Sequence, residues 1–323
     1  MPVTLEQARQ NATDALDLAV IYEFRTNQIL DLLTFQDVVN PAGGGGTLTY
    51  TYTRKVSRGT AAFRALNTEY TPDESTTSRH SVDLKPLGGA FQVDRIIAGI
   101  GPAATGSIAL NMSDKIASAR AEFGNAVING DSAENEDSFD GLSKALAGSS
   151  TEIDAADGEY DWSASVDEST SFTILEALDD LLGTLDGEQG AAIVGNKRAI
   201  NKIKSAARRS SMYVQAPGPR STTISSYGPV RLIEAGNGAD GNQPVIPVAA
   251  DGTTDLYAVR FALDGFHGVS TMGGSLVKQW QPDFNSAGAV KTGEVELGPI
   301  GVALKKTKAA AVVRGLKVAG TAA

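Results

Sequence analysis

Two histidines are the first candidates for catalytic chemistry, because the chain contains only His80 and His267 and has no cysteine. A Ser-His-Asp triad would have to use one of them. The strained serine turn of many hydrolases needs the pattern Gly-x-Ser-x-Gly, and the nearest stretch, residues 268–272, lacks the closing glycine. We expect His80 in the polar tip of a loop and His267 at the end of a strand. The sequence therefore predicts no catalytic residue.

Glycine-rich segments offer no phosphate-binding loop. Four consecutive glycines occupy residues 43–46, but the Lys-Ser or Lys-Thr pair of a Walker motif is missing. The second candidate, Gly99-Ile100-Gly101, is followed by a proline and has no third glycine at the spacing of a dinucleotide fingerprint. We interpret the glycine run as a hinge, and we predict no cofactor.

Acidic clusters remain as candidates for metal binding or acid–base catalysis. Residues 131–137 carry four carboxylates, yet Ala133 stands at a ligand position of the calcium loop and no glycine supports the turn. Residues 251–255 are a weaker candidate. The chain has 38 acidic residues, so a pair of catalytic carboxylates like that of glycoside hydrolases stays an open alternative, although no neighbouring tryptophan or tyrosine points to a particular pair. We predict solvated loops, no metal site, and core or interface roles for Trp162 and Trp280.

Charge is segregated along the middle of the chain. Residues 131–189 contain seventeen acids and one base, whereas residues 190–233 contain eight bases and no acid. The basic block 197–220 is the only candidate for nucleic-acid binding, and Tyr213 is its only aromatic residue. The acidic stretch offers a ready complement on an identical neighbouring copy, so contact between copies explains both blocks at once.

Composition limits the class of protein. The chain has 323 residues, enough for about two domains. Its net charge of -10 argues against coating nucleic acid through the overall field, and the lack of cysteine excludes disulfides. No basic stretch followed by an apolar run stands at the start, and no eighteen apolar residues run together, so we expect neither an export signal nor a membrane contact.

Periodicity predicts an unusual set of elements in the first third of the chain. A helical arm is expected over residues 4–33, followed by the glycine hinge. Residues 47–53 alternate strictly and predict a strand, and a second alternating stretch spans residues 82–93. More than twenty mostly polar residues separate them. A two-stranded arm of this length is expected to lie against another surface, in this chain or in a neighbour.

Further elements follow after residue 100. Apolar residues at steps of three and four predict a long helix over residues 105–128, ended by Asn129-Gly130. Ser165 and Glu168 fit a capping box for the next helix, and residues 191–194 predict a buried strand. Asn196 can cap a basic helix that runs to about residue 210. Short strand-like runs fill the rest, and the alternation of helices and strands indicates an α+β or α/β fold.

The order of these elements resembles the major capsid proteins of tailed double-stranded DNA bacteriophages, which have the Hong Kong 97 fold, an α+β fold. The best single stretch is Ile116-Ala-Ser-Ala-Arg-Ala-Glu-Phe-Gly-Asn-Ala-Val-Ile-Asn-Gly-Asp131, which leads to Phe139-Asp-Gly-Leu142. In that family a helix ending in Asn-Gly-Asp or similar, followed by a Gly-Leu turn, stands at this point. The resemblance rests on the order and spacing of elements over nearly the whole chain.

The resemblance implies a division of the chain into five parts. These are an N-terminal arm (1–46), an E-loop hairpin (47–97), a P-domain with a long spine helix (98–145), an A-domain (146–285) and a C-terminal return to the P-domain (286–323).

It also implies a function and partners. The chain would self-assemble into pentamers and hexamers of an icosahedral shell around packaged double-stranded DNA, which it touches without sequence specificity. The protein would act in the virion capsid after assembly in the host bacterial cytoplasm, without enzymatic activity. Expected partners are a separate scaffolding protein, a portal protein, and decoration or minor capsid proteins. Some relatives join subunits through a lysine and an asparagine, and Lys55 and Lys85 lie in the expected arm.

Two alternatives stay open at this stage. An encapsulin-like compartment would share the fold but hold protein cargo. A soluble two-domain hydrolase would need titratable groups that converge in a pocket, and the abundance of carboxylates is its only support.

Overall fold

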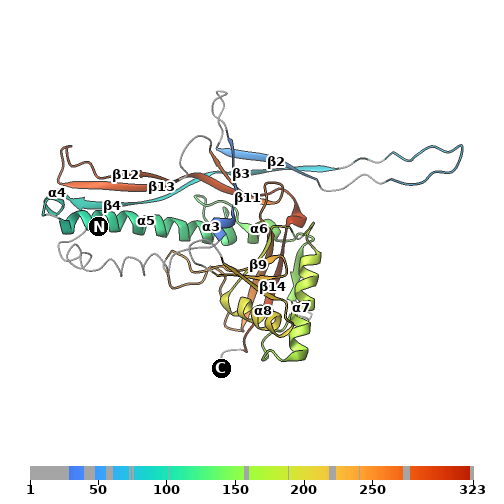
Figure 1. The fold of residues 1–323 in the computed structure, drawn as a ribbon. Helices are drawn as coiled ribbons and strands as arrows, with labels where there is room; N and C mark the ends of the chain where they lie inside the picture. The colour runs from blue at the N-terminus through green and yellow to red at the C-terminus, as the bar shows by residue number, and fades with distance from the viewer. Residues whose placement is uncertain are drawn as a thin grey trace.

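The computed structural model describes residues 29–39, 48–55, 61–72, 74, 76–100, 102–155, 160–187, 189–217, 223–239, 241–271 and 277–320. A long layer of strands and one long helix lies above a compact lower unit built on a second sheet (Figure 1). The expected arm over residues 4–33 lies outside the described residues except for its last residues, which include the short helix α3 (Ile29–Leu32). The glycine hinge at 43–46 also lies outside them.

The upper sheet is organised around one long strand. Its members are β1 (Phe35–Val39), β4 (Lys85–Asp94), β11 (Phe266–Thr271), β12 (Val277–Trp280) and β13 (Val290–Leu304). The second half of β13 pairs with β11, and its first half pairs with β12 on one edge and β4 on the other, all antiparallel. Strand β1 joins β11 in parallel. One strand thus spans the layer from end to end.

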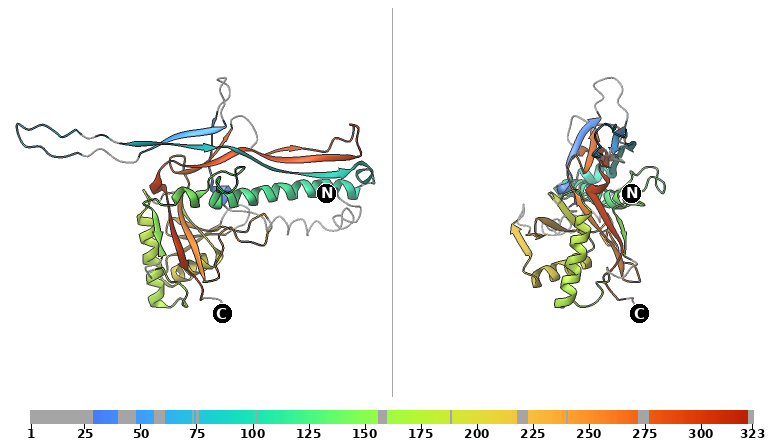
Figure 2. Two further views of the ribbon diagram at one scale, coloured as in Figure 1. Left: turned by 180° about the vertical axis from the view of Figure 1, so that it is seen from behind. Right: turned by 90° about the vertical axis from the view of Figure 1, so that its right-hand side faces the viewer.

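The long helix α5 (Pro102–Asn129) runs beneath β4 and β13 (Figures 1 and 2). It follows the short helix α4 (Arg95–Ala98) and confirms the helix predicted over 105–128. Its apolar stripe is buried: Met112 packs with Phe91, Val93 and Val295 below the far end of the sheet. Near the helix C-terminus, Phe123 lies between the rings of Phe35 and Phe139. The stripe therefore fixes the helix under both halves of the sheet.

A two-stranded hairpin projects from this layer. Strands β2 (Thr49–Lys55) and β3 (Thr77–Asp83) pair antiparallel with each other and extend beyond the body (Figures 1 and 2). The root is anchored by Tyr50 and Leu84, which pack on Val269 and Ala303 of the upper sheet. His80 lies within β3, opposite Tyr52, so its expected position in the polar tip is wrong. The alternation in the sequence around residue 80 is weak, because Ser78 and Arg79 break the apolar pattern.

The lower unit is a seven-stranded sheet with the order β5-β14-β10-β6-β9-β8-β7. Its strands are β5 (Glu152–Asp154), β6 (Ala191–Gly195), β7 (Tyr213–Pro217), β8 (Thr223–Tyr227), β9 (Val230–Glu234), β10 (Thr253–Arg260) and β14 (Ala310–Lys317). Successive residues of β6 enter different cores, since Ile193 faces one cluster and Val194 the other. Burial on both faces explains the uninterrupted apolar run at 191–194.

Two helices cover one face of the lower sheet. These are α7 (Glu168–Gly183) and α8 (Lys197–Arg209), which share a core with β6, β10 and β14. The other face packs toward α5 and the short helix α6 (Leu142–Leu146). A 3-10 turn at Thr307–Ala309 leads into β14. Residues 286–323 therefore contribute β13 to the upper sheet and β14 to the lower one.

The two helix caps differ in how well local sequence predicted them. The Asn196 side chain accepts a hydrogen bond from the Arg198 amide at 2.9 Å, which confirms the predicted cap of α8. The capping box at Ser165 and Glu168 is wrong. Asp167 caps α7 instead, accepting from the amide and hydroxyl of Thr170, both at 2.7 Å. A carboxylate is favoured there because it also interacts with the positive end of the helix dipole.

Candidate assembly surfaces

His267 is the second residue of β11, as expected for a strand end, but its environment is apolar. The residue is fully buried, and neither ring nitrogen has a hydrogen-bond partner in the described structure. The ring meets the face of Tyr50 edge-on, with centroids 6.2 Å apart. Burial, helped by the positive charge of Lys305, lowers the pKa of His267 to about 4. The ring is thus a neutral packing group that supports the hairpin root.

His80 lies on the surface of the hairpin. Its Nε2 is 2.9 Å from the Ser78 hydroxyl, and its ring stacks on Tyr52 at 5.7 Å. Partial burial and the nearby Arg54 lower the pKa of His80. Among the described residues no carboxylate hydrogen-bonds to either histidine ring, so the Ser78–His80 pair lacks the group that orients and stabilises a catalytic imidazolium.

The acidic loop is held by one lysine. Lys144 bridges Asp131 at 2.5 Å and Asp140 at 3.0 Å, and the hydrogen bond from Lys144 lowers the pKa of Asp131. At the other acidic candidate, Asp251 accepts from the amide and hydroxyl of Thr253 in a local turn. The described part of the chain contains no group of three acidic or histidine side chains that could hold a metal ion. These carboxylates are occupied in shaping turns.

Arg314 joins four elements in a cluster that the sequence did not reveal. From β14 it contacts Glu152 of β5 at 2.8 Å, Asp255 of β10 at 3.0 Å, and both the hydroxyl and the carbonyl of Ser143 in α6 at 2.8 Å. The partners lie between 59 and 171 residues away in sequence. A guanidinium suits this role because its fork of donors serves several acceptors at fixed angles.

The hairpin tip exposes large apolar side chains. Phe63 is fully exposed, Leu66 is almost fully exposed, and Arg64 lies over the ring of Tyr70 at 5.3 Å. We call residues 61–72 the apolar tip. Side chains of this size gathered on a projecting element indicate a contact with another molecule.

A second exposed apolar set lies at the opposite end of the layer, around α4 and the turn between β12 and β13 (Figure 1). It consists of Ile96, Ile100, Trp280, Phe284 and Val290. Trp280 is 48% exposed, whereas Trp162 is 1% exposed and belongs to the lower core. The two tryptophans therefore differ in role: Trp162 is a core residue and Trp280 is available to a partner.

A cleft of about 620 Å³ lies between the hairpin root and the acidic turn. Tyr52, Arg54, His80 and Lys144 contribute to its wall. Lys85 also lines it and donates to the Glu136 carbonyl at 2.6 Å, so this candidate for a covalent link is engaged with its own chain. The side chain of Lys55 lies outside the described residues. Titratable groups do meet here, but none of them forms a nucleophile–base pair oriented by a carboxylate.

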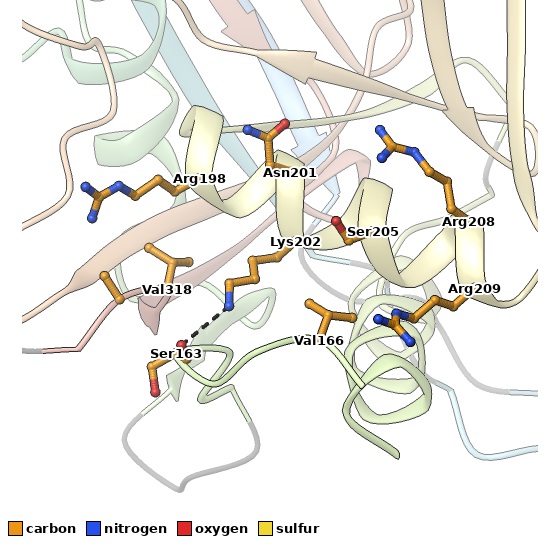
Figure 3. A pocket seen from close by; sticks show the side chains of 10 residues that line it. Ser163, Val166, Arg198, Asn201, Lys202, Ser205, Arg208, Arg209 and Val318 are labelled. Atoms are coloured by element: carbon orange, nitrogen blue, oxygen red, sulfur yellow. Dashed lines mark hydrogen bonds between the residues drawn. The ribbon is translucent and has the colours of Figure 1, made fainter. Parts of the chain in front are cut away.

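A wider groove of about 900 Å³ runs along α8. Figure 3 shows Arg198 at one end and Arg208 and Arg209 at the other, with Val318 and Val166 between them. The central Lys202 donates to the carbonyls of Ser163 and Ala164. Four of the bases of α8 in the predicted basic block, Arg198, Lys202, Arg208 and Arg209, thus line one surface. We call this surface the α8 groove.

No family model and no curated protein matches the sequence. Solved structures do match it. A chain of the holo-SrpI encapsulin complex from Synechococcus elongatus PCC 7942 aligns with a TM-score of 0.56 and 14% identity over 91% of this chain and 89% of that one. The capsid of an empty GTA particle aligns with a TM-score of 0.56 and 14% identity over 90% and 89% of the two chains.

The capsid of Myoviridae phage XM1 aligns with a TM-score of 0.51 and 13% identity over 90% of this chain and 91% of the other. Nearly complete coverage of both chains means that the likeness includes the upper layer and the lower unit together. The chain has the α+β Hong Kong 97-type capsid fold. The helices of the described residues include none long and apolar enough to cross a membrane.

Proposed function

We propose that this chain is the major capsid protein of a tailed double-stranded DNA phage, and that it assembles as pentamers and hexamers into an icosahedral shell. The observation that carries the proposal is the apolar tip, held away from the body on a hairpin whose own core is confined to its root. Phe63 and Leu66 gain nothing from this position in an isolated chain, since their apolar surface stays in water. A neighbouring subunit would remove that surface from solvent.

The five-part division of the chain is part of this proposal. The arm (1–46) and the E-loop (47–97) would reach neighbours, while the P-domain (98–145) and the C-terminal segment (286–323) would form the continuous shell. The A-domain (146–285) would gather around the symmetry axes. Packaged DNA, a portal, a scaffolding protein and decoration proteins are the partners this role implies, in a virion assembled in the bacterial cytoplasm, and the role needs no catalysis.

An encapsulin-like compartment is the second candidate, because an encapsulin chain aligns as well as the GTA capsid does. Contents distinguish the two functions: double-stranded DNA supports a phage capsid, and a protein cargo supports a compartment. Several of the matching structures are phage or GTA capsids, which favours the first.

The test is a double substitution at the apolar tip. Phe63→Ser with Leu66→Ser should leave the fold intact, because both side chains are exposed, and should abolish closed particles in negative-stain electron microscopy. The matched control is Glu69→Gln, an exposed polar change in the same segment, which should assemble like the unchanged chain. Normal particles from the double variant would refute the role of the tip. An unchanged chain that forms no particles even when it is expressed with its neighbouring genes, which would supply the separate scaffolding protein, would refute the function itself.

A further inference from the structure

The α8 groove has the character of a docking surface rather than of a ligand pocket. Its ends are cationic, with Arg198 on one side and Arg208 and Arg209 on the other (Figure 3). Between them, Asn201, Lys202 and Ser205 line the wall on α8, where Lys202 is held by the carbonyls of Ser163 and Ala164, and Val166, Val318 and Ala319 form an apolar strip on the facing wall. An occupant that fits must carry negative charge at both ends and an apolar side chain in the middle.

Little of the groove's charge is neutralised within the chain. Lys204 of the same helix pairs with Glu234 at 3.1 Å, and Arg208 lies over the ring of Tyr213 at 5.1 Å. Among the described residues, no carboxylate forms an ion pair with Arg198, Arg208 or Arg209. The pKa of Asp167 is lowered by its hydrogen bonds from Thr170 and also by the charge of Arg209, which therefore lies near that carboxyl. Arg198, Arg208 and Arg209 are nevertheless all exposed, and guanidinium groups are the side chains best suited to bind further carboxylates in pairs of hydrogen bonds.

The outer face of α7 has the complementary pattern. Glu168, Phe172, Glu176 and Asp180 follow one another at intervals of four residues, so they form one ridge along the helix. All four are exposed, and Phe172 is 60% exposed. An aromatic ring this accessible, with a carboxylate one turn before it and another one turn after it, is the occupant that the groove requires. We call these four residues the α7 ridge.

The two surfaces also match in length. At about 1.5 Å per residue, the ridge from Glu168 to Asp180 is about 18 Å long. The groove follows α8 from Arg198 to Arg209, about 17 Å by the same rise.

Within one molecule the ridge is turned away from the groove. The opposite face of α7, with Leu175, Leu178 and Leu182, is buried in the lower core that α7 shares with α8. The ridge therefore points out of the molecule. A contact between ridge and groove has to involve two molecules.

We propose that the α7 ridge of one copy docks into the α8 groove of a second copy. Phe172 lies on the strip formed by Val166 and Ala319, and the carboxylates of the ridge face the arginines at the ends of the groove. Because ridge and groove are different surfaces, the contact is head-to-tail, and its repetition closes a ring or forms a filament. The inference rests on the proposed function and deepens it by naming the contact that builds a pentamer or hexamer.

A nucleic-acid backbone is the competing occupant, because phosphates also bind arginine. Two observations favour the ridge. The groove has an apolar strip that a phosphate backbone would leave unused, and the aromatic side chain that would use it stands on the ridge of the same chain, between two carboxylates. The phosphate alternative becomes an outcome of the test.

The test is a reciprocal charge reversal in the full-length chain. Arg198→Glu with Arg209→Glu reverses the groove, Glu176→Lys with Asp180→Lys reverses the ridge, and a fourth chain carries all four changes. Each pair alone should lower the yield of oligomers and particles at least about tenfold, because like charges then face each other. The fourfold variant should recover them, since its charges are opposite again and its net charge is that of the unchanged chain.

A matched control carries Lys197→Glu and Lys308→Glu, two exposed bases outside the lining of the groove. It changes the net charge as much as the groove variant does and should assemble normally. Sedimentation velocity would measure oligomers and negative-stain microscopy would measure shells. Circular dichroism would verify that each variant is folded.

Three results would overturn the docking: reversal pairs that assemble normally, a fourfold variant that stays as defective as its parents, or a groove variant whose shells form but package no DNA. The last would assign the groove to phosphates. A different result would contradict only the proposed function: the unchanged chain forms oligomers, the paired variants lose them and the fourfold variant regains them, but no closed shells appear. Failure of the docking and failure of the function are therefore distinguishable.

Discussion

Acid should weaken the hairpin root through one buried ring. His267 packs against Tyr50, and burial together with Lys305 disfavours the charged ring more than the backbone of Gly265 favours it, so a proton on the ring would place a poorly compensated charge inside the sheet. Replacing it by leucine, His267→Leu, keeps an apolar group of similar bulk and removes the titration. The expected consequence is a loss of stability on acidification in the unchanged chain that the variant does not share.

The magnitude follows from the pKa of about 4 against an ordinary value of 6.5. Between these values the unfolded chain binds a proton that the folded chain does not, so the free energy of unfolding falls as the pH falls. From pH 7 to pH 5 this difference corresponds to about 2 kcal/mol, and the full effect, reached below pH 4, is about 3 kcal/mol. Carboxylates whose pKa is lowered, such as Asp167, contribute mainly at lower pH.

The assay is urea denaturation of the full-length, unassembled chain at pH 7 and pH 5, with intrinsic fluorescence as the readout. The unchanged chain should lose about 2 kcal/mol more than His267→Leu between the two pH values. His80→Leu is the matched control, because it removes the only other histidine, whose partly exposed ring loses less solvation on folding. Equal losses in the unchanged chain and His267→Leu would refute the reasoning.

Two further predictions concern the core. Gly141→Ala should destabilise the fold by about 3 kcal/mol in thermal unfolding, because a Cβ there would lie 2.6–2.8 Å from backbone atoms of Ala126, Gly130 and Ile128. The control Gly183→Ala should change the stability little, since no atom lies within 4 Å of the added Cβ. Equal melting temperatures of the two variants would contradict the close packing at Gly141. Trp162→Ala should cost about 3–5 kcal/mol in urea denaturation. Trp280→Ala should cost only about 1–2 kcal/mol, because half of its side chain is already exposed, and equal losses would contradict the assignment of the two residues to core and surface.

Local patterns in the sequence predicted the elements whose cause is local. The 191–194 strand, the Asn196 cap and the helix over 105–128 each depend on residues within a few turns of one another, so spacing and residue type were sufficient. The prediction of the α7 cap failed because local sequence alone could not decide between two candidates. Asp167 and Ser165 are both acceptable caps, and only the backbone path decides between them.

The 15-residue strand β13 was not predicted as one element. Gly293, Pro299 and Gly301 interrupt its pattern, and in a sequence such residues indicate turns. In the structure Gly293 is required by contact, because a Cβ there would lie 2.6 Å from the ring of Phe91, two hundred residues earlier in the chain. Arg314 is similar, since its partners become neighbours only after three strands and a helix have assembled. Long-range contact, not propensity, decides these positions.

The sequence predicted that charged surfaces meet between copies, but it did not predict which residues form those surfaces. Charge counts predicted that acidic and basic stretches face each other between copies. In the structure Asp131 and Asp140 pair with Lys144 of their own chain, and the contact that we propose uses only the acids of α7. Phe172 could not be recognised as a surface residue from the sequence, because it fits the apolar spacing of α7, but in the structure it is exposed.

The exposed features of this chain share a physical cause. The inner faces of α5, α7 and β6 are buried within the chain, so the interior is satisfied without any neighbour. Phe63, Phe172 and Trp280 are exposed. They belong to three separate elements, the hairpin, α7 and β12, which lie in different parts of the molecule (Figure 1). A single pairwise contact could cover at most one or two such sites. Contacts with several neighbours at once, as in a closed shell, would cover all three.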